Sequence, residues 1–415
     1  MKNRFRSLLL IFGLIALSNL SPNAVLCSAA IAIPFSVKSV TSDDDLTKAF
    51  RHDPKWRGAD GACTVPLNDS TTVWLFGDTF IRKAGLKKNQ LEKEASKTDS
   101  SKNDSRKENS QKDDAKSFAF INNSAAVQKV RSNSLKFFWK TENDSPQAIM
   151  APTRLQGTAQ PKSWYWPGDG FVLEQKLFIV NKLVFPEEKT EEKMFGFDWR
   201  SDDLLSVSNP STPPSSWKWQ VVALPEKSKE VLLGTACLVK TDYVYFYSSL
   251  PRLAKGWHVH PTGVSRISKV ALTSMDMSKF SFWNGKEWSN DSSQSAVVFE
   301  DGAPEMTVTE LQGEPYLVAT YMPPLSSDIS MRFSKSPEGP WSAPLKVFHC
   351  PEGQVKVLDH NNSVYSAKAH PELSRNKDEV IVSYCSNPGE MKHYLSRPDL
   401  YYPRLIRVSL QPAKL

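Results

Sequence analysis

The feature that most constrains the fold is a series of short apolar segments separated by Pro, Gly, Asn and Ser turns. No long segment shows helical periodicity. The apolar segments are rich in Val, Tyr, Phe and Trp, which favour strands. The clearest examples are residues 72–76, 171–180, 243–247, 316–321 and 380–384. The pattern predicts an all-β protein.

Aligned on these segments, the chain divides into five units with a common plan. Each unit begins with small or polar residues and continues with a hydrophobic strand and a strand that carries Ser or Arg. The first four units end near one or more Trp residues expected on an outer strand. This repetition predicts a five-bladed β-propeller over residues 33–415, with residues 34–40 completing the last blade. A pair of β-sandwiches would also show many short strands, but the recurring outer Trp favours blades.

The N-terminus and one internal segment stand apart from these units. Residues 1–32 have the layout of a secretory signal peptide, because Lys2, Arg4 and Arg6 precede a short apolar run and small residues. An uncleaved anchor and lipidation at Cys27 are the alternatives. Residues 85–116 are almost entirely polar, so we expect a disordered low-complexity insertion in a blade-one loop. A charged tether to a wall or matrix is the alternative.

The formal net charge of +7 initially suggests nucleic acid or a membrane surface as partner. Residues 1–32 and 82–116 together account for all of it, so no basic face remains to bind nucleic acid. No second apolar run approaches the length of a membrane span. We therefore expect a secreted or periplasmic monomer that does not contact a membrane after signal removal.

Four cysteines remain after the signal peptide: Cys63, Cys237, Cys350 and Cys385. They allow three complete disulfide pairings, among which Cys350–Cys385 is preferred because both lie in the last two units. Buried free thiols fit the sequence equally well. No Cys or His cluster has zinc spacing, so we expect no metal site and no cofactor. A structural cation in the central channel near His370 is the one exception considered.

The candidate functional residues lie at the starts of the units. In order they present Asp60, Asp169, Thr235 and Glu305, and the fifth presents His370 with Glu372. The innermost strands of a propeller converge on one funnel, so these residues are expected to meet there. Asp78, at the end of the second strand of the first unit, is expected to face the same mouth.

Paired carboxyl groups are the requirement for glycoside hydrolysis, because one donates a proton and the other activates water or attacks the sugar. We predict as catalytic residues Asp60, Asp78, Asp169 and Glu305. Each has a structural alternative: the aspartates could occupy turns that cap backbone amides, and Glu305 could form an ion pair. We predict as substrate-binding residues Trp56, Trp164, Tyr165, Trp166, His370 and Glu372. The aromatic rings could stack on sugar faces, although His370 could instead be a core histidine.

Several motifs resemble a known family. The segments GADG at 58–61 and WLFGDT at 74–79 resemble the opening of secreted five-bladed propellers long labelled as a domain of unknown function, some of which are endo-D-arabinanases. SPEGPWS at 336–342 resembles an outer-blade motif shared with sialidases and with the arabinanase/xylosidase and invertase groups. AHPEL at 369–373 resembles the family's last blade.

The resemblance implies that Asp60 and Asp78 form the acid/base pair of an inverting hydrolase. It also reveals a departure, because arabinanase propellers place an acid on blade three, where this chain has Thr235 and Ala236. The leading hypothesis is an exported glycoside hydrolase acting on a furanoside such as arabinan. The alternatives are a non-catalytic carbohydrate-binding propeller and a protein-interaction scaffold docked through the insertion.

Overall fold

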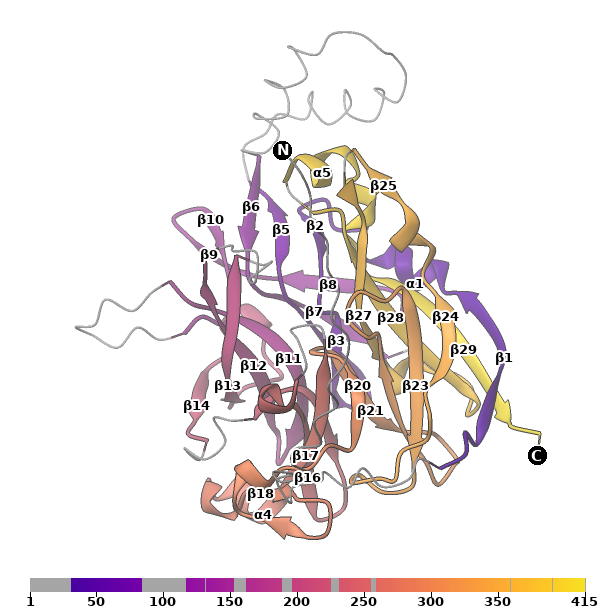
Figure 1. Ribbon diagram of the computed structural model, residues 1–415. Coiled ribbons are helices and arrows are strands. Elements are labelled where there is room, and N and C mark those ends of the chain that lie inside the picture. The colour runs from indigo at the N-terminus through magenta and orange to yellow at the C-terminus, as the bar shows by residue number, and fades with distance from the viewer. Residues whose placement is uncertain are drawn as a thin grey trace, which may run out of the picture.

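The computed structural model describes the chain in segments, which are residues 31–83, 117–130, 132–152, 162–188, 196–224, 231–254, 259–358, 360–389 and 391–414. The predicted insertion 85–116, and the predicted signal peptide except its last two residues, lie outside the described residues. Strands dominate the described part (Figure 1). None of its helices is long and apolar enough to cross a membrane.

Five antiparallel sheets of four or more strands follow one another along the described chain. The first contains β3 (Cys63–Asn68), β4 (Thr71–Phe76), β7 (Ser124–Lys129) and β8 (Leu135–Phe138). The second contains β11 (Trp164–Leu173), β12 (Lys176–Pro186), β13 (Phe197–Val207) and β14 (Trp219–Val222). The third contains β15 (Leu232–Val239), β16 (Tyr243–Ser249), β17 (His260–Ser268), β18 (Ser281–Trp283), β19 (Trp288–Ser289) and β20 (Phe299–Gly302).

The fourth and fifth sheets have the same plan. The fourth contains β21 (Met306–Glu310), β22 (Leu317–Tyr321), β23 (Asp328–Ser334) and β24 (Leu345–His349). The fifth contains β27 (Ser363–Ala369), β28 (Glu379–Asn387), β29 (Arg404–Pro412) and β1 (Phe35–Ser42). Because β1 pairs with β29, the N-terminal strand completes the last sheet, as the sequence predicts.

Smaller elements decorate these sheets. Three further strands form a separate sheet: β2 (Trp56–Ala59), β5 (Thr79–Arg82) and β6 (Phe118–Ile121). Two hairpins are formed by β9 (Lys140–Glu142) with β10 (Ser145–Gln147), and by β25 (Lys356–Val357) with β26 (His360–Asn361). The α-helices are α1 (Asp44–Ala49), α4 (Lys269–Thr273) and α5 (Met391–Ser396). The 3-10 helices are η1 (Pro214–Ser216), η3 (Pro251–Leu253), η4 (Met277–Lys279), η5 (Ser292–Gln294), η6 (Pro351–Gln354), η7 (Pro371–Leu373) and η8 (Pro398–Leu400).

The second strand of the first sheet shows how neighbouring sheets are arranged. In β4, Val73 and Leu75 pack against the second sheet, whereas Trp74 and Phe76 pack against the fifth. Successive side chains of a strand point to opposite faces, so β4 is apolar at consecutive positions because both of its faces are buried.

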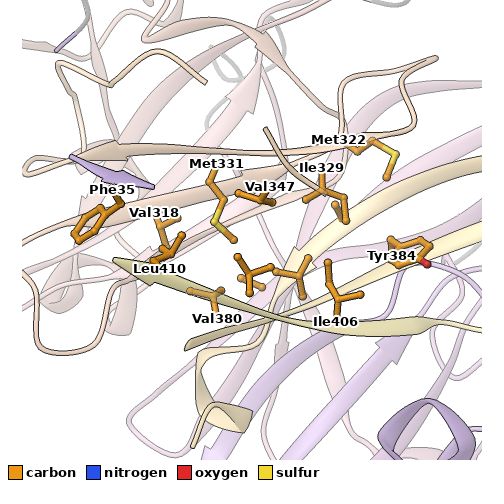
Figure 2. Packing of buried hydrophobic residues seen from close by; sticks show 14 of the residues in the cluster. Phe35, Val318, Met322, Ile329, Met331, Val347, Val380, Tyr384, Ile406 and Leu410 are labelled. Atoms are coloured by element: carbon orange, nitrogen blue, oxygen red, sulfur yellow. The ribbon is translucent and has the colours of Figure 1, made fainter. Parts of the chain in front are cut away.

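Each remaining pair of neighbouring sheets encloses its own hydrophobic cluster. One cluster joins the second sheet to the third, one the third to the fourth, and one the fourth to the fifth. Figure 2 shows the last of these, where Val318 and Met331 of the fourth sheet meet Val380 and Ile406 of the fifth. Together with the clusters on the two faces of β4, they close the five sheets into a ring.

One predicted strand is wrong. The segment 171–180 is a hairpin, because Glu174 and Gln175 adopt positive φ angles and turn the chain between β11 and β12.

The four cysteines in the described part of the chain are free and buried. The preferred Cys350–Cys385 pairing is therefore corrected. Cys350 packs in the cluster between the fourth and fifth sheets, whereas Cys385 packs between the fifth and first. The two thiols lie on opposite sides of the fifth sheet and cannot form a disulfide there.

Candidate active site

Asp60 and Asp78 lie on two neighbouring chain segments at one end of the first sheet. Asp60 connects β2 to β3, and Asp78 connects β4 to β5. The Gly77 amide donates a hydrogen bond to the Asp60 carbonyl at 2.9 Å, and the Asp60 amide donates one to the Asp78 carbonyl at 3.3 Å. A Cβ at position 77 would lie 2.5 Å from Asp60 Oδ1, so glycine is required there for the carboxyl group to lie against the backbone.

The Asp60 carboxyl group is surrounded by hydroxyl donors and by acids. Tyr365 and Tyr401 donate to Oδ2 from 2.6 and 3.2 Å. Burial raises the pKa of Asp60 well above its usual value, and the charges of Asp78 and Glu305 raise it further, whereas the two tyrosine hydrogen bonds oppose the change. This group is therefore suited to carry a proton near neutral pH.

Asp78 has different partners. Its Oδ1 accepts hydrogen bonds from Asn122 Nδ2 at 3.0 Å and from Trp166 Nε1 at 2.7 Å. Burial raises the pKa of Asp78 to about 6, and these two donors limit the rise because they stabilise the ionised form. The two aspartates thus have different proton affinities, which is the arrangement that distinguishes an acid from a base in a catalytic pair.

Glu305 enters from the fourth sheet, directly before β21. Its charge raises the pKa of both Asp60 and Asp78. Three of the four predicted catalytic carboxyl groups are therefore close enough to interact.

Asp169 does not belong to this group. It is 6% exposed, and its carboxylate accepts hydrogen bonds from the Cys63 thiol and from the amides of Gly170 and Cys237. These bonds connect the innermost strands of the first three sheets. The predicted catalytic role is therefore corrected to a structural one, since the carboxylate has protein partners on both oxygens.

The four aromatic residues predicted to bind substrate also fall into two groups, one in the core and one half-buried. Trp56 and Tyr165 are 0% and 1% exposed, and Trp56 stacks on Phe137 in the core, so neither ring presents a face to a sugar. The Trp166 indole N–H donates a hydrogen bond to Asp78. The ring centroids of Trp164 and Trp166 are 6.0 Å apart. Both of these tryptophans are half-buried, and Trp166 contacts the carboxyl group directly.

His370 is fully buried. Its Nδ1 lies 2.7 Å from the Thr64 hydroxyl, and its Nε2 lies 2.7 Å from the Ser383 hydroxyl. Burial lowers the pKa of His370 to about 3, so the ring is neutral. Because both ring nitrogens are occupied, the predicted substrate contact and the considered cation site near His370 are replaced by a core role.

Glu372 lies beside the same threonine, and burial raises its pKa to about 7. Its Oε1 is buried without a hydrogen-bond partner among the described residues. The described residues also contain no group of three or more Cys, His, Asp or Glu side chains suited to hold a metal ion.

Two buried lysines lie near the acids, and sequence reasoning missed both. Lys368 Nζ donates to the Gly168 carbonyl at 2.7 Å, which links the fifth sheet to the second, and Lys182 Nζ donates to the Gly234 carbonyl at 3.1 Å. Burial lowers the pKa of Lys182, whereas neighbouring acids that include Glu305 raise the pKa of Lys368 against the effect of its burial. Lysine is rarely buried, so no sequence signal identifies these positions.

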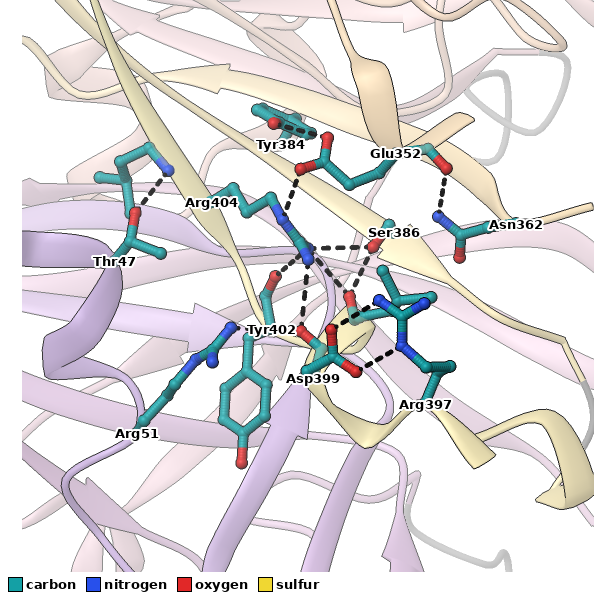
Figure 3. A network of polar contacts seen from close by, with 12 residues as sticks. Thr47, Arg51, Glu352, Asn362, Tyr384, Ser386, Arg397, Asp399, Tyr402 and Arg404 are labelled. Atoms are coloured by element: carbon teal, nitrogen blue, oxygen red, sulfur yellow. Dashed lines mark hydrogen bonds and ion pairs between the residues drawn. The ribbon is translucent and has the colours of Figure 1, made fainter. Parts of the chain in front are cut away.

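Sequence reasoning also missed Tyr365 and Tyr401, which both bond to Asp60. An arginine network holds the segment of Tyr401 in place. Arg404 donates to the carbonyls of Asp399, Leu400 and Tyr402 and pairs with Glu352 at 2.9 Å (Figure 3). These bonds fix the backbone on both sides of Tyr401. Its hydroxyl can then reach Asp60.

Comparisons with known proteins agree with this geometry at the level of family and fold. The family described as Domain of unknown function (DUF5005) matches residues 43–103 and 99–410. No match was found among curated proteins. A "putative hydrolase" of Bacteroides ovatus has a similar solved structure, with a TM-score of 0.64 and 17% identity over 91% of this chain and 93% of that one.

Glycoside hydrolases also occur among the structural matches, at lower similarity. A family 117 glycoside hydrolase of Zobellia galactanivorans has a TM-score of 0.43 and 10% identity, covering 91% of this chain and 90% of its own. The GH43_1 enzyme of Xanthomonas citri complexed with xylose has a TM-score of 0.41 and 10% identity, covering 89% and 92%.

Proposed function

This chain belongs to the family described as Domain of unknown function (DUF5005), and on that premise we propose that it is an exported glycoside hydrolase. Its proposed substrate is a polysaccharide, with a furanoside such as arabinan as the first candidate. We also propose that the protein is a monomer and that it is secreted or periplasmic. The proposed reaction uses amino-acid side chains and requires no metal ion or cofactor.

We infer that the ring of five sheets is a five-bladed β-propeller. Two observations support this inference: the hydrophobic clusters between successive sheets, and the closure of the fifth sheet by β1. In such a fold the first strands of the sheets surround the axis, and ligands bind at one end of it. Asp60 lies in the short connection that leads into β3, and Glu305 directly precedes β21, and these are two of the first strands.

The proposed reaction uses two carboxyl groups of unequal proton affinity. Protonated Asp60 donates its proton to the glycosidic oxygen as the bond from that oxygen to the anomeric carbon breaks. Ionised Asp78 accepts a proton from the water that attacks the anomeric carbon, which inverts its configuration. The turnover leaves Asp60 ionised and Asp78 protonated, and proton exchange with solvent restores both.

The observation that carries this proposal is the contrast between the two aspartates. Asp60 is buried beside two acids, which favour its neutral form against the opposing effect of its two tyrosine donors, whereas Asp78 accepts two N–H donors, which favour its charged form. A structural turn aspartate would have no need of a second buried carboxyl group beside it.

The test is sugar release from a polysaccharide panel that includes arabinan. Asp60→Asn and Asp78→Asn should each lower release by at least 100-fold, roughly the value of one general acid or base. Asp144→Asn is the matched control, since Asp144 is exposed and has the positive φ angle that asparagine accepts. Full release by both site variants would overturn the proposal.

A non-catalytic carbohydrate-binding propeller is the second candidate. One observation favours it: β15, the first strand of the third sheet, carries no acid, and Thr235 there has a buried hydroxyl without a partner among the described residues. Glycan binding without release by the unmodified protein would support this candidate. Release that depends on Asp60 and Asp78 would exclude it.

A further inference from the structure

One face of the β5–β6 hairpin continues outward from the candidate active site. β5 begins directly after Asp78, and β6 ends one residue before Asn122. Residues two apart in a strand share a face, so Asp78 shares its face with Phe80, and Asn122 shares its face with Phe120. The register pairs Phe80 with Phe120 across the hairpin, and their ring centroids are 5.2 Å apart.

The opposite face of the hairpin belongs to the core. Ile81 and Ile121 pack there with residues of the first and fifth sheets. The face that carries Asp78 and Asn122 is therefore the one opposite this core cluster.

Helix α5 covers part of this outward face. Tyr394 stacks on Phe80 at 4.0 Å, and the Tyr401 ring lies 5.4 Å from Phe80. Phe120 remains 52% exposed. Among the described residues, the large hydrophobic side chains in the exposed class include only this one aromatic ring.

The exposed ring is continuous with the site. It lies two residues, roughly 7 Å along a strand, from Asn122, which donates to Asp78. Contacts also lead inward from Phe120 through Phe80 to Tyr401, which bonds to Asp60. Exposed aromatic rings bind flat apolar surfaces such as the faces of sugars, while polar groups beside them bind hydroxyls.

We propose that Phe120 is a sugar-stacking subsite that binds a residue of the polysaccharide next to the one cleaved between Asp60 and Asp78. This deepens the proposed function and rests on it. A glycan fits the feature better than a protein partner, because the other exposed large hydrophobic side chains of the described residues lie elsewhere along the chain, on β14, on α4 and in two loops.

The experiment measures binding separately from hydrolysis. Affinity for soluble arabinan is measured in the Asp60→Asn background, which is expected not to degrade the polymer. Adding Phe120→Ala should weaken binding about five- to tenfold, the size expected for losing one aromatic contact. Adding Phe120→Trp should preserve binding, and adding Phe120→Leu, which keeps apolar area without a ring face, should behave as Phe120→Ala. Val270→Ala, at an 80% exposed position on α4, is the control and should change nothing.

Each contrary result has its own meaning. Equal arabinan binding by the Phe120→Ala and parent proteins, or full binding by Phe120→Leu, would overturn the stacking subsite. Absence of binding in the parent would overturn the furanoside assignment. An effect of Phe120→Ala seen only after deletion of residues 85–116 would identify that segment as the occupant and overturn a glycan site. Failure of the catalytic proposal shows instead as undiminished sugar release by Asp60→Asn.

Discussion

At the scale of single residues, similar local sequence leads to different chemistry. Asp60 and Asp169 each stand beside glycine in similar motifs, yet Asp169 accepts three hydrogen bonds that join three strands, whereas Asp60 accepts two hydroxyl donors. A carboxylate bonded by backbone amides has little capacity left for a substrate. The number and kind of donors therefore decide which aspartate belongs to the active site.

His370 allows a test at the residue scale that does not depend on any enzymatic activity. Its pKa is about 3 in the folded protein, below the ordinary value of 6.5, because the ring is buried. Between pH 6.5 and about 3, the unfolded chain therefore binds a proton at this histidine that the folded chain does not. Stability from this group is complete above pH 6.5 and falls as the pH falls toward 3.

Between pH 6.5 and 5, His370 should cost the wild type about 2 kcal/mol of unfolding free energy. His370→Gln can keep two hydrogen bonds but cannot titrate, so its stability should depend less on pH by that amount. Urea denaturation at the two pH values measures the difference. His52→Gln, at an exposed position, should retain the wild-type slope. Equal slopes for His370→Gln and wild type would show that the ring is not held neutral.

At the scale of elements, the N-terminal strand β1 completes the fifth sheet. It is remote in sequence from the strands of the fifth sheet, yet it pairs with β29 through residues 35–42. Phe35 adds packing to these backbone bonds, because its ring contacts Phe333 of the fourth sheet at 5.1 Å. One strand thus joins the two ends of the chain and seals the cluster between two sheets.

Phe35→Ala should destabilise the protein by about 3–5 kcal/mol, because it leaves a cavity in a buried cluster. Chemical denaturation monitored by tryptophan fluorescence measures the change. Phe120→Ala removes the same atoms from an exposed strand position and should change stability by about 0.5 kcal/mol or less. A small effect of Phe35→Ala would mean that β1 is not an integral part of the sheet.

At the scale of the whole molecule, the ring packs the hydrophobic faces of neighbouring sheets against one another. The thiols lie inside this ring: Cys63 and Cys237 are near Asp169, Cys385 is in the cluster between the fifth and first sheets, and Cys350 is in the next cluster. Burial raises the pKa of Cys63, Cys237 and Cys385 well above the ordinary value. Thiolate formation is suppressed at these three positions, and Cys350 is equally shielded by packing.

These four thiols should not react with a thiol-specific reagent in the native protein and should all react together when urea unfolds the chain without reductant. Absorbance during labelling measures the number modified, and peptide mapping without reduction identifies any crosslink. Native-state labelling of one thiol would reveal local opening at its cluster. A Cys350–Cys385 crosslink would contradict the separation of the two thiols by the fifth sheet.

The sequence by itself determined the strand-rich composition, the five repeating units, the strand that completes the last sheet, and Asp60, Asp78 and Glu305 as acids at one end of these units. These follow from local patterns, since apolar segments, turns and glycine positions depend on neighbours in the chain. Tertiary structure decided that Asp169, Trp56, Tyr165 and His370 belong to the interior. It also brought Lys182, Lys368, Tyr365 and Tyr401 close to the acids. The physical reason is that burial and hydrogen-bond partners come from other strands, such as the one that carries Thr64, 306 residues from His370. Such partners leave no periodic trace in the residues that they surround.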